Sequence, residues 1–165
     1  MARYEPDPNV TLSVLDRLVD LDPYNRSDPP LSRANSLRQL KASLRRDLEW
    51  LLNTRRRPDA ITEGSTELSR SLFNYGLPDL TSLGVHSVHD QNRLLWMLET
   101  AVTYFEPRLM GVRVTLEPVP GTARMLRFQI QGMLKMDPAP ERVSFDTVLE
   151  LTKGEYEVGS DTRAR

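Results

Sequence analysis

Leucine residues recur at helical spacing in the first third of the chain, and the pattern predicts two helices of different length. A short amphipathic helix is expected over Thr11–Val19, and the segment Leu21–Pro23 ends it. A longer helix is expected to begin at Ser36, because Gln39 three residues later completes a capping box. This helix continues to Asn53, and its apolar stripe consists of Leu37, Leu40, Leu44, Leu48 and Leu51.

Loop-forming residues then prevail up to the start of a third helix. A short helical patch is expected near Thr66–Phe73. Gly76 and Pro78 indicate an ordered turn, because Gly adopts a positive φ and Pro fixes its own φ. The third helix is expected to start near Asp90 and to be stopped by Pro107. Its apolar face consists of Leu94, Leu98, Ala101, Val102 and Phe105.

After Gly111 the apolar period changes from 3.6 to 2, which predicts strands. Apolar and polar residues alternate over 112–117, 126–131 and 143–149, and a shorter run covers 156–158. The short Pro- and Gly-containing connections favour an antiparallel meander. Helices followed by strands indicate an α+β fold, in which a small antiparallel β-meander packs on the long helices.

The composition along the chain predicts three parts. Residues 22–32 contain three Pro, two Asp and two Ser, which is typical of a linker. We therefore expect residues 1–32 to form an N-terminal extension whose helix is a docking element separated from the main body. Residues 33–159 are expected to form one domain, and residues 160–165 a disordered tail. The candidate partner-binding side chains of the extension are Leu12, Leu15 and Leu18.

Several classes of site are excluded by the overall composition. The 165 residues carry a net charge of −1. They include no Cys, and this absence excludes disulfide scaffolds, thiolate metal sites and cysteine nucleophiles. The longest apolar run, Leu94–Leu98, is far too short to span a bilayer, and no signal peptide is expected. The sequence predicts a cytoplasmic protein with no cofactor and no direct membrane insertion.

Charged side chains leave catalytic and metal-binding alternatives to consider. A glycosidase requires two carboxylates at a defined separation, one of them protonated. Glu49 and Glu106 are candidates, but no spacing in the sequence singles out a pair. His86, His89 and Asp90 are zinc-ligand types, although their polar setting at a helix start favours exposed loop histidines.

A basic segment raises the question of nucleic-acid binding. Residues 33–57 include eight basic and two acidic residues, and a basic helix can bind phosphates. Residues 1–32 and 141–157 each carry a net charge of −3, so the basic charge can also be neutralised within the protein. We favour intramolecular or protein partners and expect no nucleic acid.

Two further features suit a protein interface. Trp50 and Trp96 lie opposite the apolar stripes of their helices, and Arg46 precedes Trp50 by one turn. The chain's own strands could cover them, or they could form an interface, where Trp and Arg are enriched. In the segment Glu106–Arg108, the proline makes a rigid corner. Its arginine forms either a surface ion pair of little energetic value or a fork onto a partner's carboxylate or carbonyl groups.

Six segments in a fixed order carry a family resemblance: Ser13–Leu18, Ser36–Lys41, Asp47–Arg56, Asn74–Leu80, Phe105–Leu109 and Phe145–Leu149. Together they resemble the TssE family, the baseplate subunits of bacterial type VI secretion systems. That family is similar to the lysozyme-like wedge protein of contractile-tail phage baseplates. The resemblance spans nearly the whole chain, from about residue 11 to residue 158.

The resemblance implies a structural, non-enzymatic part of an injection machine, which docks to the wedge and offers sheet edges for sheath polymerisation. It implies that Glu106, Pro107 and Arg108 dock to the wedge core. The implied partners are TssF, TssG, TssK and the contractile sheath subunits, assembled at the cytoplasmic face of the inner-membrane secretion complex. The alternative is a peptidoglycan hydrolase, although the family's lysozyme-like name places no catalytic residue in this sequence.

Overall fold

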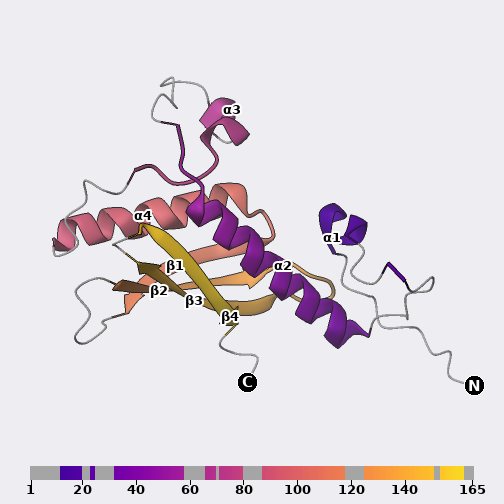
Figure 1. The fold of residues 1–165 in the computed structure, drawn as a ribbon. Coiled ribbons are helices and arrows are strands. Elements are labelled where there is room, and N and C mark those ends of the chain that lie inside the picture. The colour runs from indigo at the N-terminus through magenta and orange to yellow at the C-terminus, as the bar shows by residue number, and fades with distance from the viewer. Residues whose placement is uncertain are drawn as a thin grey trace, which may run out of the picture.

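Helices precede strands along the chain (Figure 1). The computed structural model describes residues 12–19, 23–24, 32–57, 66–69, 71–79, 87–117, 125–150 and 153–161. The helical elements within these ranges are α1 (Val14–Leu18), α2 (Arg33–Asn53), α3 (Thr66–Ser69), the 3-10 helix η1 (Leu72–Asn74) and α4 (Val88–Phe105). The strands are β1 (Leu109–Glu117), β2 (Met125–Leu134), β3 (Glu141–Glu150) and β4 (Glu155–Asp161).

The strands form one antiparallel sheet in the order β1-β2-β3-β4. The predicted α+β fold with a β-meander is therefore confirmed. The proposed division at residues 32 and 159 stays a prediction, because most of the linker and the tail lie outside the described residues.

Helix α2 begins one turn earlier than the sequence pattern indicated. Its N-cap is Ser32, whose hydroxyl accepts a hydrogen bond from the backbone N–H of Asn35. The predicted capping box at Ser36 is wrong, because Ser36 lies inside the helix and is buried. A Ser occurs at both positions, and the upstream hydroxyl meets the first free N–H groups of the longer helix. The predicted end at Asn53 is confirmed.

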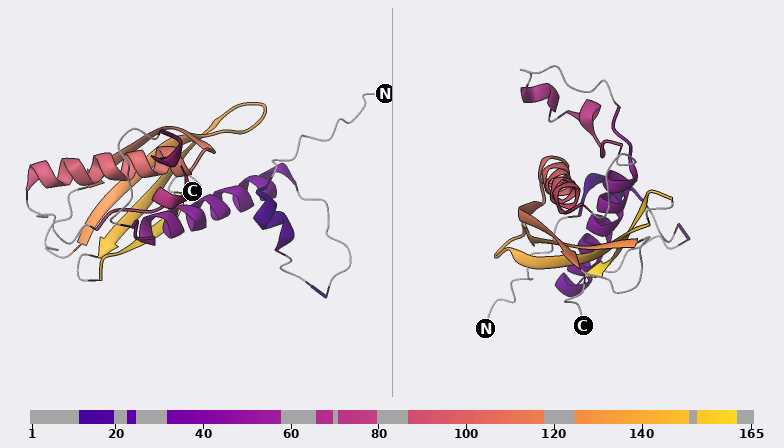
Figure 2. Two further views of the ribbon diagram at one scale, coloured as in Figure 1. Left: turned by 90° about the horizontal axis from the view of Figure 1, so that it is seen from above. Right: turned by 90° about the vertical axis from the view of Figure 1, so that its left-hand side faces the viewer.

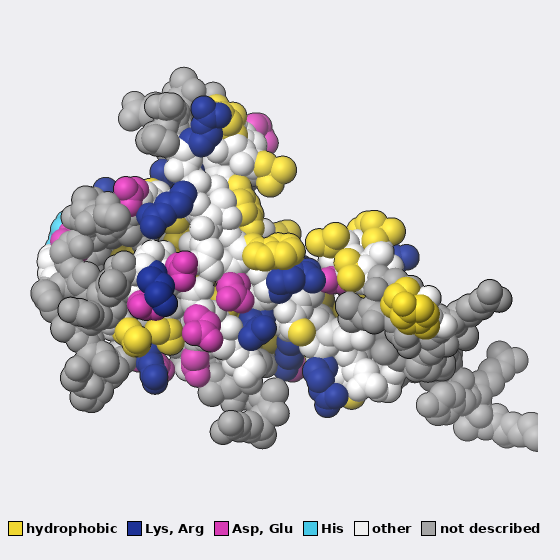
Figure 3. Space-filling view, viewed as in Figure 1, with side chains coloured by type: hydrophobic (Ala, Val, Ile, Leu, Met, Phe, Trp, Pro, Cys, Tyr) yellow, Lys and Arg dark blue, Asp and Glu magenta, His cyan; other side chains and the backbone are white. Residues whose placement is uncertain are grey.

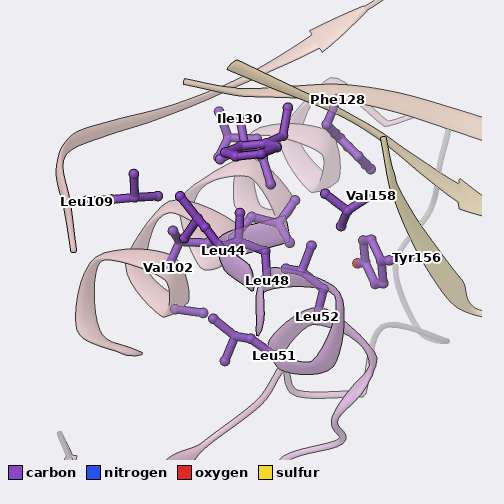
Figure 4. Packing of buried hydrophobic residues seen from close by; sticks show 14 of the residues in the cluster. Leu44, Leu48, Leu51, Leu52, Val102, Leu109, Phe128, Ile130, Tyr156 and Val158 are labelled. Atoms are coloured by element: carbon purple, nitrogen blue, oxygen red, sulfur yellow. The ribbon is translucent and has the colours of Figure 1, made fainter. Parts of the chain in front are cut away.

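The two long helices supply the core that covers one face of the sheet. Leucines of α2 pack against inward-facing residues of the strands (Figure 4). Four leucines of the predicted α2 stripe are buried, and Leu37 packs against the cluster from its margin. Helix α4 runs beside β1, α2 lies along β4, and α1 lies beside α2 (Figure 2). The apolar face predicted for the third helix is buried too, with Phe105 partly so.

Alternation along the strands separates a buried face from a polar face. In β2, Phe128 and Ile130 are almost fully buried, whereas Gln129 between them is half-buried and donates to Asp146 on β3. The register shifts between Met110 and Arg113, where Gly111 adopts φ +60°. Such a bulge bends and twists the edge strand locally.

A turn around Gly76 fastens the loop region to the end of α2. The N–H of Leu77 donates to the carbonyl of Thr54, and the N–H of Arg56 donates to the carbonyl of Leu77, both at 2.8 Å. Gly76 has φ +103°, so the ordered turn predicted there is confirmed. This contact holds the Tyr75 ring edge-on to Phe105 at the end of α4, with 5.3 Å between ring centroids.

Replacing Gly76 by Ala is expected to lower the free energy of unfolding by roughly 2–5 kcal/mol. The new Cβ would lie 2.3 Å from the Thr54 carbonyl oxygen in addition to the strain of positive φ. Gly111→Ala is the matched control, because its φ is also positive but no atom lies within 4 Å of the new Cβ. It should cost only about 1–2 kcal/mol. Urea denaturation of both variants measures the difference, and equal losses would contradict the argument.

Candidate docking site

A pocket of about 320 Å³ brings together four of the eight predicted site residues. It lies where the C-terminal half of α2 meets the end of α4 and the start of α1. Trp50 lines it, and so does the corner formed by Glu106, Pro107 and Arg108, which lies far from Trp50 in the sequence. The remaining lining residues are Ser13, Asp47, Leu51, Tyr75 and Phe105.

The floor of the pocket is a rigid corner between α4 and β1. Glu106 caps the C-terminus of α4, and its carbonyl accepts the N–H of Leu109, which closes the turn over Pro107. The Glu106 side chain is buried, with the residue only 4% exposed. Its oxygens accept both prongs of the Arg108 guanidinium, with Nε–Oε1 at 2.6 Å and Nη2–Oε2 at 2.5 Å.

This geometry matches neither sequence alternative for the corner. The Glu106 carboxylate is buried and Arg108 is partly exposed, and the Arg108 fork closes on Glu106 of the same chain rather than projecting outward. Glu106 raises the pKa of the Arg108 guanidinium above its ordinary value, although burial acts in the opposite direction. A fork–fork pair of this kind fixes orientation as well as charge.

Arg108 also connects the corner to α2 and, through Asp47, to α1. Its Nη2 donates to Asp47 Oδ2 at 2.6 Å, and its Nη1 donates to Ser43 Oγ at 3.2 Å. Asp47 Oδ1 accepts two hydrogen bonds from Arg46, and Arg46 in turn pairs with Asp16 of α1 at 2.9 Å. Five alternating charges therefore run from α1 across α2 to the start of β1.

Trp50 is the exposed aromatic side chain of the pocket. It is 53% exposed, so the chain's own strands do not cover it. The Arg46 guanidinium lies over the ring, 4.9 Å from its centroid, a cation–π arrangement that holds the ring in place. Trp96 is exposed as well, but it lies outside the pocket. Of the two predicted interface tryptophans, Trp50 therefore lines the pocket and Trp96 does not.

Helix α1 is attached to α2 instead of being separated from the main body. Asp16 reaches Arg46, and Leu12 packs against the edge of the core. Leu15 and Leu18 face outward, and Leu18 is 77% exposed. Figure 3 shows hydrophobic side chains gathered at the position of α1. Of the predicted apolar stripe, Leu12 therefore contacts the core, whereas Leu15 and Leu18 face solvent.

The catalytic and metal alternatives receive no support from this geometry. Both oxygens of Glu106 accept hydrogen bonds from Arg108 of the same chain. Glu49 does not line the pocket. His86 lies outside the described residues, and His89 is an exposed residue in the first turn of α4. No cluster of three potential metal ligands occurs within the described ranges.

The basic segment is partly neutralised within the protein, as one of the sequence alternatives required. Lys41 pairs with Glu141 on β3, and Arg46 pairs with Asp16 on α1. Arg55 pairs with Asp79 in the loop after η1. The first two pairs link α2 to both acidic segments of the chain.

Comparison with known proteins gives one family match. A family model described as baseplate wedge protein gp25 matches residues 38–139, which is more than half of the chain. The matched range includes Trp50 and the whole Glu106–Arg108 corner, but not α1. No curated protein matches the chain. Across the parts of the chain that are described, no helix is both long and apolar enough to cross a membrane.

The Arg108→Ala variant is expected to lose about 3–5 kcal/mol of stability, because it leaves the Glu106 carboxylate buried without its partner. Adding Glu106→Gln to this variant should recover part of the loss by removing the buried charge. Arg46→Ala is the control at a more exposed pair and should cost no more than about 1 kcal/mol. Urea denaturation tests the order, and an Arg108→Ala loss as small as that of Arg46→Ala would contradict it.

Attachment of α1 is expected to weaken in acid. Burial would raise the pKa of Asp16, but hydrogen bonds from Ser13 and Arg46 outweigh it and lower the pKa below its ordinary value of 3.8. The stabilisation is therefore complete above that ordinary value and is lost as the pH falls through the lowered pKa. Amide hydrogen exchange at Val19, which donates to the Leu15 carbonyl, reports the release. Asp16→Asn should exchange faster at neutral pH and lack the acid transition; the same transition in this variant would exclude Asp16 as its cause.

Proposed function

Because the chain belongs to the gp25 family of baseplate wedge proteins, which is also the family of TssE, we propose that it is the type VI baseplate subunit that joins wedge and sheath. The family supports a structural role in the baseplate of a contractile injection system. The proposal has two parts: one surface docks to the wedge, and a sheet edge initiates sheath polymerisation.

The pocket at the Glu106–Arg108 corner is the proposed wedge-docking surface. The observation that carries this proposal is the convergence of Trp50 and Pro107 on one pocket that the buried fork holds rigid. An exposed aromatic side chain beside an arginine is the composition of an interface hot spot. Rigidity adds to affinity, because little conformational entropy is lost when a partner binds.

The role of the fork in docking is indirect in this proposal. Arg108 donates hydrogen bonds to Glu106, Asp47 and Ser43 of its own chain. It therefore determines the shape and charge of the surface more than it contacts a partner directly. The outer residues of α1, Leu15 and Leu18, extend the same surface with apolar area. We propose TssF, TssG and TssK as the wedge partners, assembled at the cytoplasmic face of the inner-membrane secretion complex.

The sheet supports the second part of the proposal. An open four-stranded sheet has two edge strands, here β1 and β4. Edge strands can accept a strand from another chain, with backbone hydrogen bonds supplying affinity and side-chain alternation supplying register. A protein with a docking pocket and a strand-accepting edge can connect a wedge to a growing sheath.

Trp50→Ala is expected to reduce retention of wedge subunits by a tagged chain about 30-fold or more, the effect of removing an interface hot spot. The fold should persist, because Trp50 is largely exposed. Trp96→Ala is the matched control, since Trp96 is exposed but lies outside the pocket, and it should retain the wedge subunits. Co-purification from the native cytosol measures both. Equal retention by the two variants would remove the pocket from the docking site, and recovery of the chain alone with wall-digesting activity would overturn the structural role.

A further inference from the structure

The two edges of the sheet are closed in different ways, which bears on where a partner strand can add. In an antiparallel sheet, alternate residues of an edge strand direct their N–H and C=O groups away from the neighbouring strand. An incoming strand must reach these outward groups. The side chains that already occupy them therefore decide which edge is available.

The β4 edge is held by α2. The Asn53 side chain donates to the Tyr156 carbonyl and accepts the Tyr156 N–H, both at 2.8 Å. This pair of bonds resembles the exchange between two paired residues of neighbouring strands. Arg45, also on α2, donates to the carbonyl of Val158 at 3.4 Å. Both side chains come from α2, whose leucines are buried in the core. Freeing the β4 edge would therefore require α2 to move.

On the β1 edge, a side chain of α4 accepts a hydrogen bond from an outward N–H group. Val114 lies opposite Ile130 of β2, between the pairs Arg113–Gln131 and Thr115–Gln129. The intervening residue, Val114, directs its N–H outward and donates it to Glu99 Oε1 at 2.8 Å. Glu99 projects from α4, and its carboxylate oxygen takes the place that a carbonyl oxygen of an added strand would take. A rotation about the side-chain bonds of Glu99 frees this N–H without moving any backbone.

We propose that residues 113–117 of β1 are the strand-accepting edge and that Glu99 is its removable guard. The inference rests on the proposed function, because it names which edge receives the sheath. The incoming segment is an extended strand that presents a backbone carbonyl to Val114 and carries a Lys or Arg to pair with the displaced Glu99 carboxylate. Until that strand arrives, Glu99 keeps the edge from pairing with other copies of the chain.

Proline substitution at Thr115 is a poor test of this edge. Because the Val114 N–H points away from β2, the alternation along the strand directs the N–H of Thr115 toward β2, so a proline there would disrupt the protein's own sheet. Cysteine labelling is preferable, because the chain contains no Cys of its own. Thr115 and Glu157 are exposed residues on β1 and β4, three strand spacings apart, or roughly 14 Å.

The experiment uses Thr115→Cys and Glu157→Cys, each carrying a maleimide-linked photo-crosslinker, incubated with wedge and sheath subunits. We expect cross-links to sheath subunits from position 115 and at least tenfold fewer from position 157. The reverse pattern would overturn the edge assignment while leaving sheath initiation intact. Sheath elongation without cross-links at either position would overturn strand addition at these edges. Absence of sheath binding by the unlabelled protein would instead overturn the proposed function.

The guard is tested separately by Glu99→Ala and Glu99→Gln. The alanine variant should expose the Val114 amide, speed its hydrogen exchange about tenfold, and bind sheath subunits about tenfold more tightly. The glutamine variant keeps an oxygen acceptor and should stay close to the unmodified protein in exchange. Asn53→Ala, at the other edge, should speed exchange at Tyr156 without tightening sheath binding. Tighter binding by Asn53→Ala alone would reverse the assignment.

Discussion

The fork between Arg108 and Glu106 is the interaction on which the candidate docking site depends. Glu106 ends α4 and Arg108 begins the approach to β1, so the pair fixes the angle at which the chain turns from helix to sheet. Burying an ionised carboxylate costs several kcal/mol unless it is paired and hydrogen-bonded. Here both oxygens are satisfied by one guanidinium. The same guanidinium also donates to Asp47 and Ser43 on α2, so it connects the end of α4 to α2.

Most of the fold could be predicted because it depends on local periodicity. The leucine spacing in α2 and the alternation in β2 and β3 predict which face of each element is buried. The short connections between strands favour a sheet in which strands neighbour one another in chain order. The predicted start of α2 is wrong because Ser32 and Ser36 are equivalent as local signals. The burial of Ser36, which excludes it as a cap, results from tertiary packing that no local pattern contains.

The site could be predicted in its components but not in its arrangement. Proline made the corner after α4 recognisable, and the helical wheel placed Trp50 away from the leucine stripe. Neither pattern states where the Arg108 fork points, because that depends on the burial of Glu106 at the end of α4. The role of Asp47 was missed for the same reason. It lies four residues from Ser43 on α2, so both side chains face the corner, but only the path of β1 brings Arg108 to them.

The contrast between the sheet edges suits a protein that must stay unpaired until it is incorporated. An open edge on a free subunit would invite pairing with other copies, so it has to be covered, and a subunit that starts a polymer must also be able to uncover it. A neutral amide that forms two bonds, as Asn53 does with Tyr156, makes a closure that belongs to the fold. A single carboxylate is easier to displace, because water or a basic side chain of the incoming strand can solvate or pair the released charge. In the proposed mechanism Glu99 meets that requirement: it accepts the Val114 N–H in the free subunit and would become an ion-pairing site once the edge is used.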